Sequence, residues 1–292
     1  MTDKKTDHLA TNFECRTPHQ NPPFIIREMM VAKANAGVLK IFLLAILAGV
    51  YIGFGCEIST LAAHDGVKFF GFGATKVLAG AVFSVGLMLV VITGGELFTG
   101  NVLIVGSVLD RKISGKELLK NWGLVYCANF IGSILLATIV FYSNSWQQNN
   151  YLVGAYALNI GVAKTNLPFL EAFAKGILCN WLVCLAIWMS AASKHVIGKI
   201  FAIFFPIMAF VALGYEHCIA NMFFIPKAIM LTTQPEVVKA AHVSLAQLKN
   251  LNATGLINNL IPVTLGNIVS AALFIAFFYW AAFLKNESLA KR

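Results

Sequence analysis

The sequence predicts an all-α membrane protein with six transmembrane helices, of which the second and the fifth are broken in their middle. Its 292 residues are 58% hydrophobic and only 12% charged, whereas roughly 25% of residues are charged in ordinary soluble domains. Long uncharged runs recur along the chain, and a spanning helix needs ~20 mostly apolar residues. Two pairs of these runs are separated only by ionisable side chains, which are costly inside a membrane and typical of a functional site there.

The chain begins with a polar segment that lacks the apolar core of a signal peptide. Residues 1–23 contain three prolines and are expected to form a disordered cytoplasmic tail. Residues 24–38, "FIIREMMVAKANAGV", predict a short amphipathic helix that lies on the membrane. The transmembrane domain is then expected over residues 24–286, with a second cytoplasmic tail over residues 287–292.

The uncharged runs give the span count. They cover residues 41–56, 77–95, 97–109, 122–142, 176–193, 200–215, 218–226 and 255–284. Glu96 alone separates the second run from the third, and only Glu216 and His217 separate the sixth from the seventh. Each joined pair is too long for a simple spanning helix. The sequence therefore predicts six spans, two of them broken.

Lysine and arginine residues predict the orientation, because they are enriched in cytoplasmic loops. With both termini on one side, that side holds six before the first span, four between spans two and three, two between spans four and five, and three at the end. The other side holds six. Both termini are therefore expected in the cytoplasm. The net charge of +9 is explained by these basic loops, so it gives no reason to expect nucleic acid as a partner.

The two interruptions match each other in sequence. The first reads "GGELFTGNVLI" and the second "GYEHCIANMFF". Both fit G-x-E-x-x-x-x-N, with Gly94, Glu96 and Asn101 in the first and Gly214, Glu216 and Asn221 in the second. An asparagine also lies within the third span (Asn129) and the sixth (Asn267). Each half thus contains a plain span, a broken span and an asparagine-bearing span.

Three spans per half predict an inverted repeat, with halves at about residues 24–143 and 168–286. In such folds the broken helices meet near the bilayer midplane and form the substrate site. Irregular backbone at that depth is tolerated only where it lines a cavity or is buried in protein. The positive ends of the half-helices would favour an anion there.

Five stretches resemble the formate/nitrite transporter family: "GLMLVVITGGELFTGNVLIV", "KNWGLVYCANFIGSILLA", "EAFAKGILCNWLVCLAIWMS", "GYEHCIANMFFIP" and "NNLIPVTLGNIVSAALF". The resemblance covers roughly residues 24–286. It implies an aquaporin-like fold, a homopentamer with one pore per protomer in the bacterial inner membrane, no cofactor, and passage of formate, nitrite, hydrosulfide and sometimes acetate or lactate. The form "GELFTGN" resembles members linked to formate dehydrogenases, and it has Gly100 where some formate channels have serine.

The resemblance also implies roles for individual residues. His217 matches the central pore histidine, whose unperturbed pKa of ~6.5 would let it donate a hydrogen bond or a proton to an anion. The other matching positions are a pore-loop threonine that can face the histidine (Thr99), a pore-facing asparagine (Asn267), two apolar constrictions (Leu87 and Phe210) and a vestibule lysine (Lys164). A lysine near a narrow mouth raises the local concentration of anions.

The two glutamates at the breaks are expected to be structural, since a carboxylate in the pore would repel anions. Glu96 and Glu216 would accept hydrogen bonds from backbone N–H groups left free at the breaks, and Asn101 and Asn221 would tie the loops. A proton-relay role for Glu216 stays open as an alternative.

Other function classes fit less well. An enzyme would need Cys218 and His217 to act together, but adjacent residues on a helix point about 100° apart, and neither a third orienting group nor a metal cluster is evident. A neutral-solute channel is a further alternative; an ammonia channel would favour paired histidines, whereas this chain offers one histidine at the breaks and basic rather than acidic mouths. The sequence therefore predicts a channel or proton-coupled transporter for small weak-acid anions. Formate is the first expectation, and nitrite and hydrosulfide are the alternatives.

Overall fold

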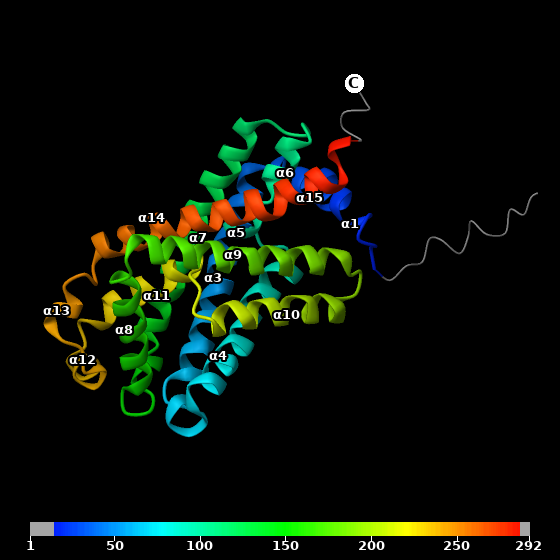
Figure 1. Cartoon of the computed structure of the whole chain (residues 1–292). Coiled ribbons are helices and arrows are strands. Elements are labelled where there is room, and N and C mark those ends of the chain that lie inside the picture. The colour runs from blue at the N-terminus through cyan, green and yellow to red at the C-terminus, as the bar shows by residue number, and fades with distance from the viewer. Residues whose placement is uncertain (1–14, 287–292) are drawn as a thin grey trace, which may run out of the picture.

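The computed structural model describes residues 15–286, and within this range it is a bundle of helices without a β-strand. Figure 1 shows α1, α6 and α15 gathered at one end of the molecule and α8, α12 and α13 at the opposite end. Both ends of the described chain lie at the first of these ends. The tail predicted over residues 287–292, and residues 1–14 of the first tail, lie outside the described residues.

The first half of the chain contains α1 Asn21–Pro23, the π-helix η1 Phe24–Met29, α2 Met30–Ala34, α3 Val38–Ala63, α4 Gly66–Thr93, α5 Phe98–Asn101, α6 Ile104–Leu109 and α7 Gly115–Tyr142. The second half contains the 3₁₀ helix η2 Ser145–Gln147, α8 Leu152–Thr165, α9 Phe169–Ala192, α10 Val196–Ala212, α11 Cys218–Leu231, α12 Pro235–Ala241, α13 Leu245–Leu248, α14 Ala253–Val269, the π-helix η3 Ser270–Phe277 and α15 Phe278–Phe283.

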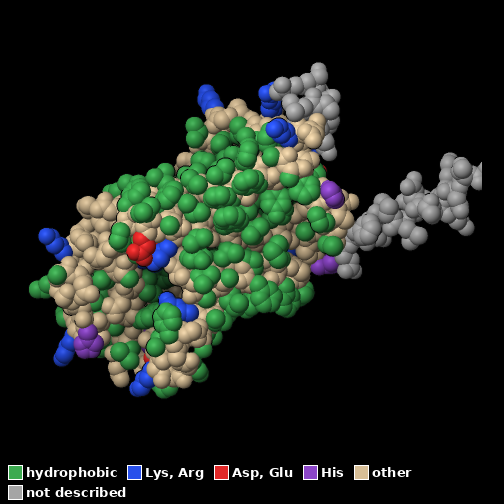
Figure 2. Space-filling view, viewed as in Figure 1, with side chains coloured by type: hydrophobic (Ala, Val, Ile, Leu, Met, Phe, Trp, Pro, Cys, Tyr) green, Lys and Arg blue, Asp and Glu red, His purple; other side chains and the backbone are tan. Residues whose placement is uncertain are grey.

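Five helices of the described chain are long and apolar enough to cross a membrane: α3, α4, α7, α9 and the continuous helix Ala253–Phe283. Three shorter apolar helices, Phe98–Leu109, Val196–Ala212 and Cys218–Leu231, lie beside the interruptions. Apolar side chains cover most of the face drawn in Figure 2. Such a surface is suited to lipid rather than to water, as the composition predicts.

Both predicted interruptions are present. Helix α4 ends at Gly94 with φ 86°, and the backbone does not become helical again until Phe98. Helix α10 ends before Gly214, which has φ 73°, and α11 begins at Cys218. Glycine adopts this left-handed backbone without the steric penalty that a Cβ imposes, so it ends each helix cleanly.

The spans on either side of the breaks pack closely through glycines. Gly132 of α7 lies against the carbonyl of Ile46 on α3, and Gly266 of α14 lies against the carbonyl of Phe173 on α9. A Cβ at either glycine would collide with backbone. These close approaches bring α7 and α14 near enough to reach the two breaks.

The N-terminal segment differs from its prediction. Ile25, Ile26 and Met30 are at most 1% exposed and belong to the protein core, so the interpretation of this segment as a helix lying on the lipid is wrong. Ser107 Oγ donates a hydrogen bond to the Ile26 carbonyl at 2.5 Å. The apolar face of residues 24–34 is thus covered by α6 and the helices next to it rather than by the membrane.

Residues 15–23, predicted to be part of a disordered tail, also make defined contacts. Arg16 donates its backbone N–H to Ala192 and its guanidinium to Ala191 O at 2.6 Å. Asn21 Nδ2 donates to Trp188 O at 2.8 Å. The segment is anchored because it satisfies free carbonyls at the C-terminal end of α9.

Candidate functional site

The two breaks meet through Thr99 and His217. Thr99 Oγ1 and His217 Nε2 are 3.0 Å apart, and both side chains are buried. His217 is also the N-cap of α11, where its Nδ1 accepts the backbone N–H of Ala220 at 3.1 Å. Since Nδ1 is used as an acceptor, the neutral ring carries its proton on Nε2. The ring therefore donates to Thr99 and holds a fixed orientation.

A polar quartet supports the first break. Lys33 Nζ donates to Glu96 Oε1 at 2.9 Å, and Asn101 Nδ2 donates to Glu96 Oε2 at 2.7 Å. Asn101 Nδ2 also donates to Asn121 Oδ1 at 3.0 Å. Asn121 Nδ2 in turn donates to the Lys33 carbonyl at 3.2 Å. The four residues, called here the Glu96 quartet, join α2, the first break and α7.

The second break has an equivalent set, the Glu216 quartet. Lys164 Nζ donates to Glu216 Oε1 at 2.8 Å and Oε2 at 3.0 Å, and Asn221 Nδ2 donates to Glu216 Oε2 at 2.6 Å. Asn221 Nδ2 also donates to Asn259 Oδ1 at 2.7 Å, and Asn259 Nδ2 donates to the Lys164 carbonyl at 2.9 Å. In both quartets one lysine, one glutamate and two asparagines make the same four residue-to-residue links.

These quartets correct one expectation. The carboxylates of Glu96 and Glu216 accept from lysine and asparagine side chains, so the prediction that they accept backbone N–H groups is wrong. Lys164, expected at the vestibule, lines the histidine pocket, and its ammonium is paired with Glu216. A paired carboxylate and ammonium are nearly neutral together, which makes their burial tolerable.

Sequence analysis missed three quartet members, although a signal was present. Lys33 lies in "VAKAN" and Lys164 in "VAKTN", so both share V-A-K-x-N. Asn121 precedes Asn129 by eight residues, and Asn259 precedes Asn267 by the same interval. Comparison of the two halves outside the breaks would have identified Lys33, Asn121 and Asn259.

Two asparagines fix the backbone of the breaks. Asn129 accepts the N–H of Phe98 at 2.9 Å and donates to the carbonyls of Glu96 (2.9 Å) and Ala45 (2.7 Å). Asn267 accepts the N–H of Cys218 at 3.0 Å and donates to the carbonyls of Glu216 (3.1 Å) and Gly176 (2.7 Å). Sequence analysis expected Asn267 to face the pore. In the structure its amide is 0% exposed and bonded to backbone.

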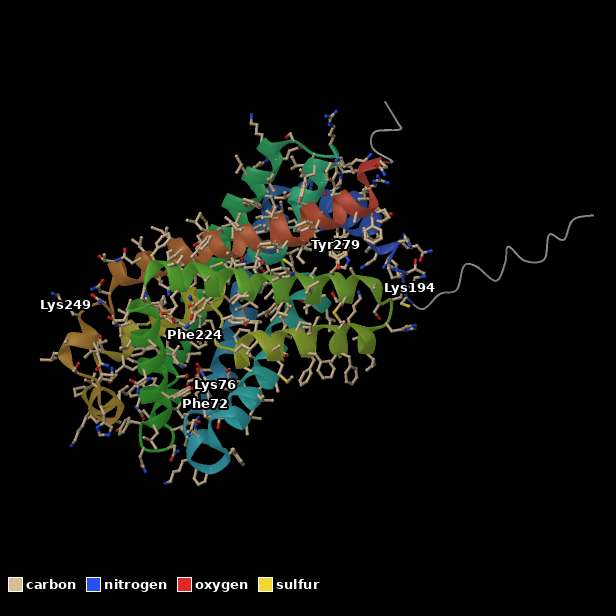
Figure 3. All side chains as sticks on the ribbon, viewed as in Figure 1. Phe72, Lys76, Lys194, Phe224, Lys249 and Tyr279 are labelled. Atoms are coloured by element: carbon tan, nitrogen blue, oxygen red, sulfur yellow. The ribbon has the colours of Figure 1, made fainter. Side chains whose placement is uncertain are left out.

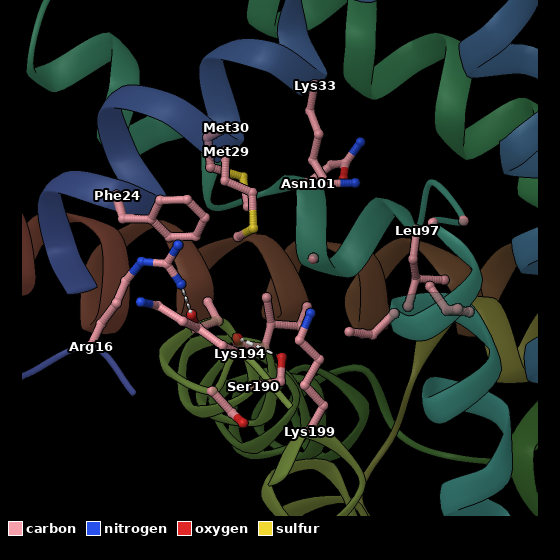
Figure 4. Close-up of a pocket in the computed structure, with 18 residues that line it drawn as sticks. Arg16, Phe24, Met29, Met30, Lys33, Leu97, Asn101, Ser190, Lys194 and Lys199 are labelled. Atoms are coloured by element: carbon pink, nitrogen blue, oxygen red, sulfur yellow. Dashed lines mark hydrogen bonds between the residues drawn. The ribbon is translucent and has the colours of Figure 1, made fainter. Parts of the chain in front are cut away.

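Two pockets are lined by residues at or close to the Thr99–His217 contact. The histidine pocket, of about 310 Å³, is lined by His217, Phe210, Lys164, Glu216 and Asn221 among others. The basic pocket, of about 360 Å³, is lined by Leu97 and Gly100, on either side of Thr99, and by residues of the N-terminal segment (Figure 4). His217 thus lines one pocket, and two residues close to Thr99 in sequence line the other.

Apolar side chains close the pockets next to the histidine. The Phe210 ring lies 6.0 Å from the His217 ring and 5.6 Å from the Phe83 ring, and Phe210 is 3% exposed. Leu87 is buried but lines neither pocket. The buried leucine that lines the basic pocket is Leu97, which sequence analysis did not single out.

The pockets differ in charge. The histidine pocket is lined by Lys76, Lys164, Lys175 and Glu216. The basic pocket is lined by Arg16, Lys33, Lys194 and Lys199, and no carboxylate of the described residues lines it. Both pockets are suited to anions. Within residues 15–286, no group of three His, Cys, Asp or Glu side chains could hold a metal ion.

Comparison with known proteins gives the family of this chain. The model of a protein family described as formate/nitrite transporter matches residues 25–281. The chain belongs to the formate/nitrite transporter family. It is therefore an integral membrane transport protein rather than an enzyme.

Among curated relatives, a probable formate transporter of Methanothermobacter thermautotrophicus is 40% identical, over 87% of this chain and 92% of the relative. The formate channel FocA of Escherichia coli strain K12 is 37% identical, over 90% of this chain and 93% of the relative. Among solved structures, a pentameric formate channel with formate bound has a TM-score of 0.76 and 42% identity, covering 85% of this chain and 98% of that one. An FNT family ion channel has a TM-score of 0.70 and 28% identity, covering 91% of this chain and 95% of that one.

Proposed function

We propose that this protein carries formate across the bacterial inner membrane in a proton-linked, pH-dependent manner, through a pore that passes the Thr99–His217 contact. The observation that carries this proposal is a buried Nε2–H donor on His217, which lines the histidine pocket and contacts Thr99, a sequence neighbour of residues that line the basic pocket. A donor suits an anion, and the two pockets suit passage in either direction. The relatives named formate transporter and formate channel support formate as the substrate.

The architecture proposed for this pore is an aquaporin-like inverted repeat of three plus three spans, with both termini in the cytoplasm. The two quartets support it, because the same residue types make the same links at both breaks. A pseudo-two-fold axis in the membrane plane would relate them. The pentameric state of a similar solved channel supports a homopentamer with one pore per protomer.

Anion entry begins at the quartet lysines. Lys164 lines the histidine pocket and Lys33 the basic pocket, each held by its glutamate. Beyond them the walls become apolar at Phe210 and Leu97. An anion that loses water there gains proton affinity, because desolvation disfavours its charged form. Formate would take a proton at this point and cross the constriction as a small neutral acid.

The geometry of His217 bears on the source of that proton. Protonation of Nδ1 would break the hydrogen bond from the Ala220 N–H, which satisfies a donor at the start of α11. The ring is therefore better suited to donate a hydrogen bond through Nε2 than to carry the proton itself. The proton would come from water that enters the pockets, and His217 would orient and stabilise the anion until it arrives.

The same argument sets the selectivity. Anions of weak acids, such as nitrite and hydrosulfide, can be neutralised by one proton and are the alternative substrates of this site. Nitrate and chloride cannot be neutralised to a useful extent, and the apolar walls should exclude them. A neutral-solute channel is less well supported, because most charged side chains that line the two pockets are cationic.

Reconstituted liposomes test this function. We expect formate flux to rise as pH falls, and nitrate to be carried barely above empty liposomes. His217→Phe should remove proton-coupled flux or change its pH profile. His217→Asn keeps an N-cap acceptor for Ala220 but lacks the ring Nε2, so it separates capping from pore chemistry. An unchanged pH profile in both variants would show that the histidine only packs.

A further inference from the structure

The basic pocket is lined by four cationic side chains, and a carboxylate of the described residues pairs with only one of them. Lys33 is paired with Glu96. Within residues 15–286, by contrast, no carboxylate pairs with Arg16, Lys194 or Lys199. Arg16 donates to the Ala191 carbonyl and lies over the Phe24 ring at 3.3 Å, contacts that leave its charge uncompensated. Three cationic side chains of the described chain therefore line one cavity without a counter-ion.

The histidine pocket does not share this property. Lys164 is paired with Glu216 at 2.8 Å and Lys175 with Glu171 at 2.6 Å, so Lys76 is the remaining lysine there. Figure 3 shows Lys194 at the turn that joins α9 and α10, beside the N-terminal segment, and Lys76 toward the other end of the molecule. The imbalance is thus confined to the side of the pore that carries the N-terminal segment.

Like charges around a small cavity repel one another, and a ligand with more than one negative charge relieves this repulsion best. The pocket, of about 360 Å³, has room for a small polyatomic anion. In Figure 4 the Lys199 side chain reaches from α10 toward the pocket, opposite Met29 and Met30 on the N-terminal segment. Lys194 and Arg16 lie along the same rim.

We propose that the basic pocket is a binding site for small divalent anions, such as sulfate, phosphate or a short dicarboxylate, and that its occupant blocks the pore from that side. The block follows from the proposed function, on which it rests. One proton makes formate neutral, whereas a divalent anion still carries charge after gaining one and cannot pass Leu97. It therefore stays at the rim and occupies the entrance.

Binding is tested first, because it does not depend on transport. Sodium sulfate is titrated calorimetrically into the purified full-length chain, with sodium chloride at equal ionic strength as the reference. The double variant Lys194→Gln/Lys199→Gln removes two rim charges, and Lys116→Gln removes an exposed charge of α7 that does not line the pocket. We expect sulfate to bind more tightly than chloride, and the double variant to weaken sulfate binding about fivefold. Equal sulfate affinity in the double variant and in Lys116→Gln would overturn the site.

The block is tested in membrane vesicles of both orientations. Radiolabelled formate uptake is measured with sulfate, phosphate or succinate added outside, each against chloride at matched ionic strength. Inhibition should occur in the orientation that exposes the N-terminal segment and should be weaker in the double variant than in Lys116→Gln. Inhibition of equal strength from both faces would overturn the one-sided block. Vesicles that carry no formate at all would refute the proposed function, and the calorimetric result would still decide the binding site.

Discussion

The two helix breaks share one framework but differ in the residues that meet at the centre. Each has a glutamate paired with a lysine, an asparagine five residues later, and a second asparagine on α7 or α14. The first residue after the glutamate is Leu97 in the first break and His217 in the second. The third residue after the glutamate is Thr99 in the first break and Ile219 in the second. The residues common to both breaks build the scaffold, and Thr99 and His217, which differ between the breaks, contact each other.

In the inverted repeat proposed above, this contrast separates the shared scaffold from the residues that differ at the centre. A buried carboxylate, ammonium and amide must satisfy one another, so selection for stability acts alike on both halves. The hydrogen-bond donor at the centre is a single side chain, His217, so only one half of the chain has to supply it. The proposed substrate path accordingly runs past the two positions at which the breaks differ, Thr99 and His217.

Removing a quartet carboxylate should perturb the protein most. Glu216→Ala leaves the ammonium of Lys164 buried without its partner and should lower the free energy of unfolding by about 3–5 kcal/mol. Glu96→Ala should cost less, because the Lys33 side chain is 24% exposed whereas that of Lys164 is 13% exposed. Thermal unfolding in detergent would measure both, with the exposed Glu236→Ala as the control. Equal costs at all three positions would refute a structural role for the quartets.

The asparagines of α7 and α14 should give the next effect. Asn129→Leu and Asn267→Leu keep the volume but leave a buried backbone N–H unsatisfied, at about 2–3 kcal/mol of stability each. The matched control is Asn159→Leu, since Asn159 is exposed and makes a single bond to Ala241 O. If Asn267→Leu were as stable as the control, the amide would be free for a role in the pore after all.

A smaller effect on stability should accompany a change in transport at Thr99. Thr99→Val removes the acceptor of the His217 Nε2–H and should cost ~1.5 kcal/mol, with a changed pH profile of formate flux. Ile219→Val changes the equivalent residue of the other break and should cost about 1 kcal/mol through the cavity it leaves. It should leave the pH profile as it was. Liposome flux and thermal unfolding, measured on both variants, separate the two roles.

The glycines that end α4 and α10 should matter least. Gly94 and Gly214 have positive φ, and a Cβ at either position would meet no atom within 4 Å. Alanine there should therefore cost only the left-handed backbone strain, ~1 kcal/mol at each position. Thermal unfolding should give similar losses for Gly94→Ala and Gly214→Ala. A loss at one glycine alone would mean that the two breaks are not equivalent in their backbone.

Much of the fold could be predicted, because the relevant signals are local. The lipid environment selects long apolar runs, and the G-x-E-x-x-x-x-N motif lies within eight residues at each break. Thr99 and His217 also lie inside these motifs. The prediction of an N-terminal helix on the membrane failed because an apolar face looks the same in sequence whether lipid or protein covers it. In the structure, protein covers Ile25 and Ile26.

The membrane class and the position of both breaks follow from the sequence alone, because each depends on composition or spacing over a short stretch. The family resemblance singled out Thr99 within the first break. The partners that those residues take depend on the tertiary structure. Lys33 reaches Glu96 across 63 residues of chain, and Asn267 reaches the backbone of Glu216 across 51. Such partners are set by how the spans pack, and a buried polar group accepts whichever donor the packing brings within hydrogen-bond distance.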